Sequence, residues 1–518
     1  MSESRTANSI RNYGVTMVSQ IVSIVLNFVG RTFLIKLLGV EYLGVNGLFG
    51  NILSLLSLAE LGFGTAITYM MYKPIADNNI NKVASYMGLF KKIYICVGMF
   101  VLIVGLMLTP FIYSLIKDTP HISENLYIIY MLFVVNSAIT YFYTYKRSLL
   151  IAYQKEYINS QNVIRFDIIK NIAIICVLYL SHNFYLYLLV QISITFLSNI
   201  VISQKANKLY PQIVKTEAQP LLKQEYCEIV KNTMAMVSNK VGSVIVSGTG
   251  NLFISYFVGI TTVGIYSNYV LLYTCVNQII GKGVNSLTAS FGNLVASSTE
   301  DQAIDVFKKI YFLNYILAFS TTILFYQLIE PFIKLWIGTE YLLDSKSCLL
   351  IVVNALFFYQ IRIPSQMVIN ACGLFWQIKW KSLVEACVCL LLSFFFLAYL
   401  ELGIFGILLS ALCSNILTNI WWEPYVAFKY GFKKSVVPYA SEFIKECVIL
   451  FASIYLLSFV NSLSDGISNS LITCMILRFL TGCIILVTTI IIFNHRKSEF
   501  KYALNFANNI IRKKKLYI

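Results

Sequence analysis

Residues 13–45 read YGVTMVSQIVSIVLNFVGRTFLIKLLGVEYLGV and contain the two features that decide the fold. The first is an apolar run, 13–35, which matches the roughly 20 residues that a helix needs to cross a bilayer. The second is the glycine-containing turn LGVEYLGV at 38–45, which recurs as VGITTVGI at 258–265, an offset of 220 residues. The stretch therefore predicts a spanning helix followed by a turn, with a second copy of this unit later in the chain.

The composition of the whole chain agrees with a lipid environment. Of 518 residues, 58% are hydrophobic and only 12% are charged, and the mean hydropathy is +0.72. Soluble domains carry roughly 25% charged residues. We expect the first apolar run to be retained as a span and not removed as a signal peptide, because no small-residue cleavage site follows it.

Apolar runs broken by charge, glycine and proline predict an all-α integral membrane protein with about fourteen spans. Their approximate limits are 13–35, 45–71, 89–113, 125–145, 158–180, 184–204, 229–257, 264–297, 309–337, 347–372, 376–400, 403–427, 441–461 and 468–493. No loop between them is long enough for a catalytic domain, so we do not expect an enzyme.

The positions of lysine and arginine test this count. When basic residues toward the ends of spans are counted with the adjoining side, 31 of the 40 basic residues fall on the inner side and five remain within spans, while the outer side has only Lys36, Lys117, Lys334 and Lys346. One span more or fewer would reverse every later loop and remove the bias, so the pattern favours fourteen spans with both termini in the cytoplasm. It also explains the net charge of +16 without a nucleic-acid partner.

The repeat extends back into the helices before the two turns. The polar residues Gln20, Ser23, Asn27 and Arg31 align at the same offset with Lys240, Ser243, Ser247 and Asn251. Spacings of three and four place each set on one helix face. Polar stripes suit helices that line a water-filled cavity, whereas packing through small polar residues would explain the serines but not Arg31 or Lys240.

A repeat offset by six spans predicts two parallel six-helix lobes around a central cavity, followed by two extra C-terminal helices. The expected organisation is an N-lobe at 1–204, a cytoplasmic linker at 205–228, a C-lobe at 229–430, spans 13 and 14 within 431–495, and a basic cytoplasmic tail at 496–518.

Basic residues within the spans are the candidate substrate-binding groups, because each costs about 2.5–3.5 kcal/mol when placed centrally in a membrane. They are Arg31, Lys240, Lys282, Arg362 and Arg478, with Gln20, Asn27 and Asn251 as polar cavity residues. The glycines on both sides of Lys282 predict a break or a kink in its helix, and Pro364 predicts a kink beside Arg362.

The central acid of the sequence is Glu60, which could bind a coupling proton or sodium ion, or could form a structural ion pair. Glu385, near an inner end, is expected to reach the interface. A balance of at least four cations against one acid at depth would attract an anion such as a diphosphate.

Motifs for other chemistry are absent from the sequence. No C-x-x-C, H-E-x-x-H or Walker motif occurs, so we expect no metal site, no bound ATP and no cofactor other than a coupling ion.

Four short segments resemble the Wzx-type polysaccharide flippases of the multidrug/oligosaccharidyl-lipid/polysaccharide exporter superfamily. They are 27–31 (NFVGR), 38–39 (LG), 42–44 (YLG) and 58–66 (LAELGFGTA), and the span count and the two lobes extend the resemblance to the whole chain. The resemblance implies export of an undecaprenyl-diphosphate-linked oligosaccharide from the inner to the outer leaflet of a bacterial plasma membrane by alternating access. It also implies that basic cavity residues hold the diphosphate, that spans 13 and 14 form a groove for the polyprenyl tail, and that polysaccharide polymerase and other assembly proteins are partners.

Two related functions remain open at this stage. A peptidoglycan-precursor (lipid II) flippase of the same superfamily would have the same features. A multidrug exporter of the superfamily is less favoured, because cationic drugs fit a basic cavity poorly.

Overall fold

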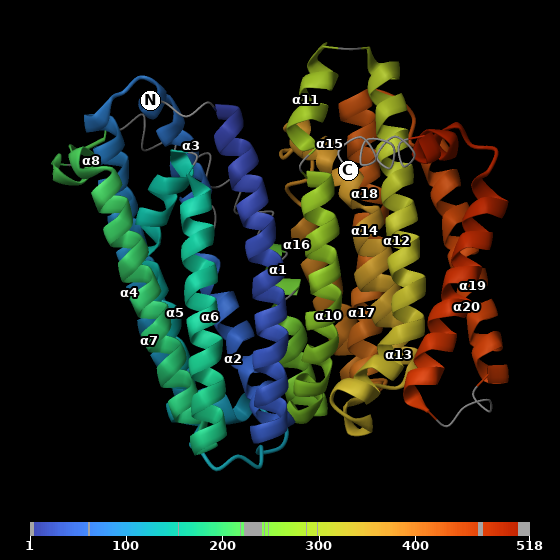
Figure 1. Ribbon diagram of the computed structural model, residues 1–518, viewed down its shortest axis with the longest axis horizontal. Helices are drawn as coiled ribbons and strands as arrows, with labels where there is room; N and C mark the ends of the chain where they lie inside the picture. Colours follow the sequence, from blue (N-terminus) through green and yellow to red (C-terminus); the bar gives the residue numbers. More distant parts are fainter. Residues whose placement is uncertain are drawn as a thin grey trace, which may run out of the picture. The chain divides into compact units, whose positions relative to one another are not determined.

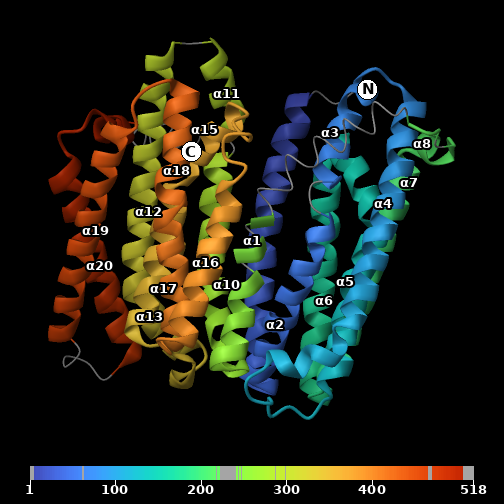
Figure 2. The same cartoon turned by 180° about the vertical axis from the view of Figure 1, so that it is seen from behind.

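The computed structural model describes residues 5–60, 63–153, 155–217, 219–221, 241–242, 244–246, 248–285, 287–297, 299–464 and 470–505. Figures 1 and 2 show it from opposite sides. The described residues form helices joined by turns, and no strand occurs among them. The chain divides into two compact units, Met1–Ser267 (unit 1) and Asn268–Ile518 (unit 2).

Unit 1 is a group of long helices whose order follows the predicted spans. It contains α1 (Arg5–Leu38), α2 (Val40–Leu56), a 3₁₀ turn (Ser57–Glu60), α3 (Phe63–Ala76), α4 (Ile80–Met107), a second 3₁₀ turn (Thr109–Leu115), α5 (Leu126–Ala152), α6 (Glu156–Ser181), α7 (Phe184–Leu209), the short α8 (Pro211–Lys215) and a π-helical turn (Ile254–Val258). Helix α10 (Ile260–Asn285) begins in unit 1 and ends in unit 2.

Unit 2 contains more interruptions. Its elements after α10 are α11 (Thr288–Ser297), α12 (Glu300–Trp336), a 3₁₀ turn (Thr339–Tyr341), α13 (Ser345–Ile351), a π-helical turn (Val352–Phe358), α14 (Tyr359–Ile361), α15 (Ile363–Ala371), α16 (Lys381–Ala398), α17 (Gly403–Leu417), α18 (Asn419–Val426), a further π-helical turn (Ala427–Phe432), α19 (Val437–Ser464) and α20 (Leu471–Asn494).

The helical membrane class predicted from the sequence is confirmed. Ten segments of the described chain are long and apolar enough to cross a membrane, and each coincides with a predicted span. The other four predicted spans correspond to α6, to α10 with α11, to the broken segment α2–α3, and to a region described only in part that ends in the shorter apolar helix Val244–Val258.

Polar caps define where several helices begin. The side chains of Asn79, Asn125, Asn183 and Asp344 each accept a hydrogen bond from the first turn of α4, α5, α7 and α13, respectively. Thr299 and Gln302 form a reciprocal capping box at the start of α12. These contacts satisfy backbone N–H groups that a helix leaves without intrahelical partners.

The two copies of the repeated turn adopt the same unusual backbone. Gly39 has φ 105° and Gly259 has φ 135°, and the two positions correspond at the offset of 220 residues. A side chain at this φ would be strained, so both turns need glycine. The geometry supports the repeat that the sequence indicates.

The predicted breaks have different outcomes. The span 45–71 is not one helix, because α2 ends at Leu56 and α3 begins only at Phe63. The kink near Pro364 is confirmed, since the helix is interrupted at Arg362 and α15 starts at Ile363. No break occurs at Lys282, because α10 continues through this position to Asn285, and two helical glycines cost only about 1 kcal/mol each; a kink there stays a prediction.

The division between the compact units falls within α10, after Ser267. The sequence places the lobe boundary earlier, in the linker 205–228, and that assignment of lobes stays a prediction. Residues 205–217 and 219–221 of the linker are described, whereas the rest of it, like the end of the basic tail, lies outside the described residues.

Candidate functional site

The acid predicted for coupling, Glu60, lies where a helix of unit 1 is interrupted. It ends the 3₁₀ turn Ser57–Glu60 between α2 and α3. The hydroxyl of Tyr94, on α4, donates a hydrogen bond of 2.6 Å to its Oε1, and Tyr141, on α5, also lies within hydrogen-bonding reach. Within the described part of the chain, Glu60 has no ion-pair partner, so its contacts come from neutral hydroxyl groups.

The approach of Tyr94 to Glu60 depends on a glycine at the start of α3. A Cβ atom on Gly64 would lie 2.8 Å from the Tyr94 hydroxyl oxygen. Tyr94 is itself only 2% exposed and packs against Phe90 and Tyr141. The ring is therefore held in place, and Gly64 leaves room for its hydroxyl. We refer to Glu60, Tyr94, Tyr141 and Gly64 as the Glu60 site.

The polar stripe of α1 contacts two neighbouring elements of unit 1. Ser23 donates a hydrogen bond of 2.8 Å to Asp167 on α6, and Asp167 also pairs with Lys170 at 2.9 Å. Arg31 donates to the hydroxyl of Ser267. Asn27, in contrast, is exposed.

The two remaining polar cavity candidates of the described chain are partly buried. Asn251 faces α2, because its Nδ2 lies 3.5 Å from the position of a Cβ atom on Gly47. Gln20 is partly buried on α1. Lys240 lies outside the described residues. Lys282 is half-buried near the end of α10.

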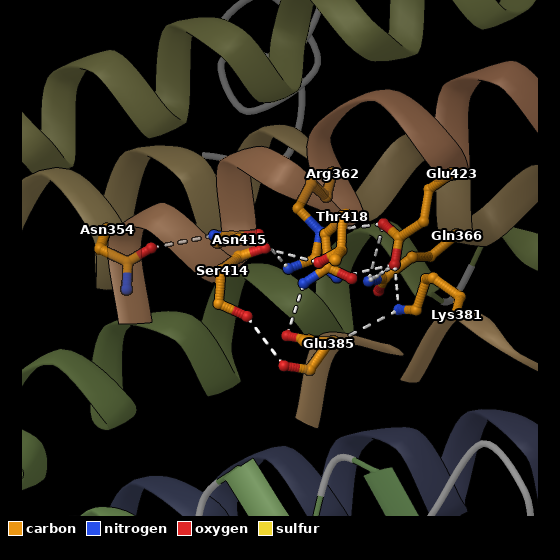
Figure 3. Close-up of polar contacts among 10 residues, drawn as sticks. Asn354, Arg362, Gln366, Lys381, Glu385, Ser414, Asn415, Thr418 and Glu423 are labelled. Carbon is orange, nitrogen blue, oxygen red and sulfur yellow. Dashed lines mark hydrogen bonds and ion pairs between the residues drawn. The ribbon is translucent and has the colours of Figure 1, made fainter. Parts of the chain in front are cut away.

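In unit 2, Arg362 belongs to a buried cluster of charges, shown in Figure 3. Its Nε and Nη2 donate to the two carboxylate oxygens of Glu423, on α18, at 2.9 and 2.7 Å. Lys381, at the start of α16, donates to the same carboxylate at 2.7 Å. Arg362, Lys381 and Glu423 are only 8%, 7% and 2% exposed. A carboxylate between two cations is held in its charged form by both partners.

Amide and hydroxyl groups complete this cluster. Arg362 Nη1 donates to Asn415, which in turn donates to Asn354, each at 2.9 Å. Gln366 donates to Glu423 at 3.2 and 3.3 Å. Buried charges are tolerated when their remaining hydrogen-bonding groups are satisfied in this way. We call Arg362, Lys381, Glu385 and Glu423, with these amides, the Glu423 cluster.

Glu385, which the sequence analysis expected to reach the interface, belongs to the same cluster. Its carboxylate accepts a hydrogen bond of 2.6 Å from Asn419 and lies 3.9 Å from Lys381. With two carboxylates against Arg362 and Lys381, the formal charges of the cluster balance. Such a cluster offers little net attraction to an additional anion.

Arg478, the last predicted cation, also lies beside an acid. Its Nη1 is 3.6 Å from the carboxylate of Glu330, on α12, and Lys334 lies 2.9 Å from the same carboxylate. One turn earlier in α12, Gln327 donates hydrogen bonds to Asn461 on α19 and to Thr481 on α20. Polar contacts thus connect the last two helices to α12.

The expected balance of four cations against one acid is wrong. Acids that the sequence analysis did not single out lie within predicted spans, namely Asp167, Glu330, Glu423 and Glu446. Glu446 is 1% exposed and accepts a hydrogen bond of 2.6 Å from Tyr311. One signal was available, because Asp167 and Lys170 have the spacing of a helical ion pair. The partner of Arg362 is 61 positions away and left no local pattern.

These observations define a multi-pass helical membrane protein in which interrupted helices carry charged side chains. Discontinuous helices of this kind position polar groups at the substrate and ion sites of many transporters. Within the described residues, no three histidine, cysteine, aspartate or glutamate side chains gather as a metal site would require.

Comparisons with known proteins agree with this class at the level of fold. No protein-family model and no curated protein sequence matches the chain. Among solved structures, it is similar to the lipid II flippase MurJ in an inward closed conformation, with a TM-score of 0.64 and 15% identity, over 94% of this chain and 99% of that chain.

Multidrug transporters are also similar in fold. An inward-facing MATE family transporter of the MOP superfamily matches with a TM-score of 0.63 and 12% identity, over 81% of this chain and 98% of its own. A mutant of the Vibrio cholerae MATE transporter VcmN matches with a TM-score of 0.59 and 14% identity, over 83% of this chain and 98% of its own. The chain therefore has the fold shared by these transporters.

Proposed function

We propose that the protein is a flippase that moves an undecaprenyl-diphosphate-linked oligosaccharide from the inner to the outer leaflet of a bacterial plasma membrane. One observation carries this proposal. The likeness to the lipid II flippase extends over 94% of this chain, whereas the likenesses to the two MATE transporters cover 81% and 83%. The extent of the match favours a lipid-linked substrate over a drug.

The difference in coverage is about a tenth of the chain, comparable with the combined length of α19 and α20. These helices are apolar, and much of their surface is exposed, as at Tyr455, Phe459 and Ile484. Exposed apolar surface on a spanning helix faces lipid. We assign to this pair the contact with the polyprenyl tail of the substrate.

The diphosphate is assigned to Arg31 and Lys282. Arginine can bind a phosphate with two parallel hydrogen bonds, and lysine supplies a compact charge. Arg31 donates a hydrogen bond to the hydroxyl group of Ser267 and lies near Tyr187. Arg362 and Arg478 lie beside acids, which favours a structural role for them, and their contact with substrate, like that of Lys240, stays a prediction.

Glu60 is assigned to coupling. A carboxylate surrounded by hydroxyl groups can accept a proton or hold a sodium ion without first separating from a cation. Its position at a helix interruption resembles the ion sites of transporters built from discontinuous helices. The ion that Glu60 takes depends on the gradient that drives transport. Measuring transport at fixed pH with and without sodium distinguishes sodium coupling from proton coupling.

The experiment that tests the substrate uses three bacterial strains. One lacks its capsule or O-antigen flippase, one is depleted of its lipid II flippase, and one lacks its multidrug exporters. We expect the protein to restore surface polysaccharide in the first strain only. Restored growth of the second strain without surface polysaccharide in the first would favour lipid II, and drug resistance alone would favour the multidrug exporter. Either result contradicts the proposal.

The assignment of the diphosphate headgroup to Lys282 is tested in the strain that lacks its capsule or O-antigen flippase. Lys282→Ala should remove most of the surface polysaccharide, and Lys282→Arg should retain part of it, because the charge is kept. Lys117→Ala, in a predicted outer loop, is the matched control and should export normally. Normal export by Lys282→Ala at normal membrane abundance would place the headgroup elsewhere.

A further inference from the structure

Glu446, on α19, is a buried acid of unit 2 to which the proposed function gives no role. Its side chain belongs to the segment Val437–Ser462, which is long and apolar enough to cross a membrane. Glu446 is 1% exposed, and its Oε2 accepts a hydrogen bond of 2.6 Å from the hydroxyl of Tyr311, on α12. Within the described part of the chain, Glu446 forms no ion pair. Burying a carboxylate without a paired cation is costly, so this position is not explained by packing alone.

Two tyrosines lie beside the carboxyl group. The hydroxyl of Tyr439, two turns before Glu446 on the same face of α19, lies near that of Tyr311. The rings of Tyr311 and Tyr439 are 5.0 Å apart and inclined at 66°. Tyr311 is itself only 7% exposed, so its hydroxyl is held in place by the surrounding side chains. We call Glu446, Tyr311 and Tyr439 the Glu446 site.

The charged groups nearest to the Glu446 site form pairs with one another. Lys497, after the end of α20, and Glu442, one turn before Glu446, both act on the Glu446 carboxyl group. These two are bonded to each other in an ion pair, and Lys445 lies 3.9 Å from Glu442. The other titratable side chains around the site are uncharged near neutral pH, and they are Tyr311, Tyr315, Tyr439 and Cys447. Glu446 therefore has no cation of its own among the described residues.

The Glu446 site has the same arrangement as the Glu60 site in the other unit. Tyr94 donates to Glu60 and Tyr311 donates to Glu446, each at 2.6 Å and each from a neighbouring helix. A second tyrosine lies close to each pair. Glu423 differs, because two cations hold it. Positions 60 and 446 are not related by the offset of 220, so the likeness does not come from the repeat.

We propose that the Glu446 site is a second proton-binding site, which belongs to unit 2 and exchanges its proton with the cytoplasm. A proton on Glu446 removes the cost of burying a charge that has no partner. Ionisable side chains within spanning helices form the proton relays of many transporters. A proton suits the site better than a hard metal cation, because ions such as Mg²⁺ and Ca²⁺ take six or more oxygen ligands, and the site offers one carboxyl group and two hydroxyls.

The exchange route lies beside the pair formed by Glu442 and Lys497. The distribution of basic residues places the start of α19 and the end of α20 on the inner side. The side chains of Glu442 and Lys497 are 34% and 28% exposed, and a spacing of four residues puts Glu442 on the same helix face as Glu446. A proton passes from a hydronium ion at the inner surface to the Glu446 carboxylate, which becomes a carboxylic acid, and water is left behind. The reverse step returns the proton to the same side.

Infrared difference spectroscopy on the purified protein in lipid vesicles tests proton binding directly, because a carboxylate and a carboxylic acid absorb at different frequencies. During an acid titration, the unmodified protein should show one carboxyl transition that Glu446→Gln lacks. Glu401→Gln is the matched control, since Glu401 is an exposed glutamate between α16 and α17. The transition lost in Glu446→Gln should occur at a different pH from the one lost in Glu401→Gln. Coincident transitions, or no transition assigned to Glu446, would overturn the proposal.

The contact with Tyr311 is tested by removing one oxygen atom. Tyr311→Phe keeps the ring and loses the hydrogen bond to Glu446, so the pH of the Glu446 transition should move by about one unit. Tyr455→Phe, at an exposed tyrosine of the same α19, should leave the transition in place. An unmoved transition in Tyr311→Phe would overturn the site as defined.

The route is tested with vesicles in which the protein has a single orientation. Acid added only on the cytoplasmic side of the protein should produce the Glu446 transition, and acid added only on the opposite side should not. An equal response from the opposite side would overturn the cytoplasmic route. None of these measurements uses a lipid-linked substrate, so their outcome is separate from that of the experiments on the proposed function.

Discussion

The Glu60 site of unit 1 and the Glu423 cluster of unit 2 both place a carboxylate among spanning helices, but their partners differ. Glu60 receives a hydrogen bond from the neutral hydroxyl of Tyr94. Glu423 lies between Arg362 and Lys381. A carboxylate with neutral partners can gain or lose a charge at modest cost, whereas one fixed by two cations cannot. We infer that the partners of an acid distinguish a coupling site from a structural site.

The largest expected effect is the loss of Arg362. Arg362→Ala leaves Glu423 with one cation fewer in a buried setting, which should destabilise the protein by about 3–5 kcal/mol. Thermal unfolding followed by size-exclusion chromatography in detergent should show a clear decrease in Tm, with a parallel loss of export. Gln366→Ala is the matched control, because it removes only neutral contacts to Glu423, and should change Tm far less. An unchanged Tm for Arg362→Ala would show that Arg362 has no structural role, and substrate binding would again be the favoured role for this residue.

The next effect should be confined to transport. Glu60→Gln retains an acceptor for the Tyr94 hydroxyl, so stability should change by less than about 1 kcal/mol. Export of surface polysaccharide should nevertheless decrease strongly, because glutamine can neither take up a proton nor neutralise a cation. Export and Tm measured on the same membranes separate the two effects. Normal export by Glu60→Gln would show that Glu60 is not needed for transport. Glu60 and Glu423 could then no longer be distinguished as a coupling site and a structural site.

A smaller effect is expected at Gly64. In Gly64→Ala the added methyl group meets the Tyr94 hydroxyl at 2.8 Å, and overpacking of this kind costs about 1–3 kcal/mol. Tyr94 should shift away from Glu60, and export should decrease partly. Gly50→Ala, a glycine in open space, controls for the gain in helix propensity. Equal export by the two variants would show that Tyr94 does not position Glu60.

The smallest effect should come from an exposed ion pair. Lys434 and Asp301 lie 3.1 Å apart, and both side chains are exposed. Exposed pairs of this kind contribute little, since water and salt screen them. Lys434→Ala should therefore leave Tm and export at the level of the unmodified protein. A decrease in Tm similar to that of Arg362→Ala would mean that burial does not explain the difference between this exposed ion pair and the Glu423 cluster.

The features predicted well from the sequence are those that depend on local patterns. Apolar runs indicated the spans, and the repeated turns at Gly39 and Gly259 indicated a shared geometry. Pro364 indicated the interruption at Arg362 because proline cannot continue a helix ladder. Each of these features depends on residues within a turn or two of each other in the chain, where backbone chemistry dominates, even where two copies of the pattern lie far apart.

The features missed are those that depend on how separate helices face one another. The interruption at Ser57–Glu60 has no proline, and its geometry depends on contacts with α4 and α5. Arg362 was expected to be available to a substrate because Glu423 lies on a distant helix whose rotation a single sequence does not specify. Burial alone therefore suggested a functional cation where the structure shows an ion pair.

Transport by purified protein tests the central claim most directly. The unmodified protein and Glu60→Gln would be reconstituted in vesicles that contain a labelled undecaprenyl-diphosphate-linked oligosaccharide, and the labelled lipid reaching the opposite leaflet would be measured. We predict that the unmodified protein moves the lipid, and that Glu60→Gln, with the same Tm, does not. Failure of the unmodified protein to move it, or equal transport by both proteins, would contradict the account.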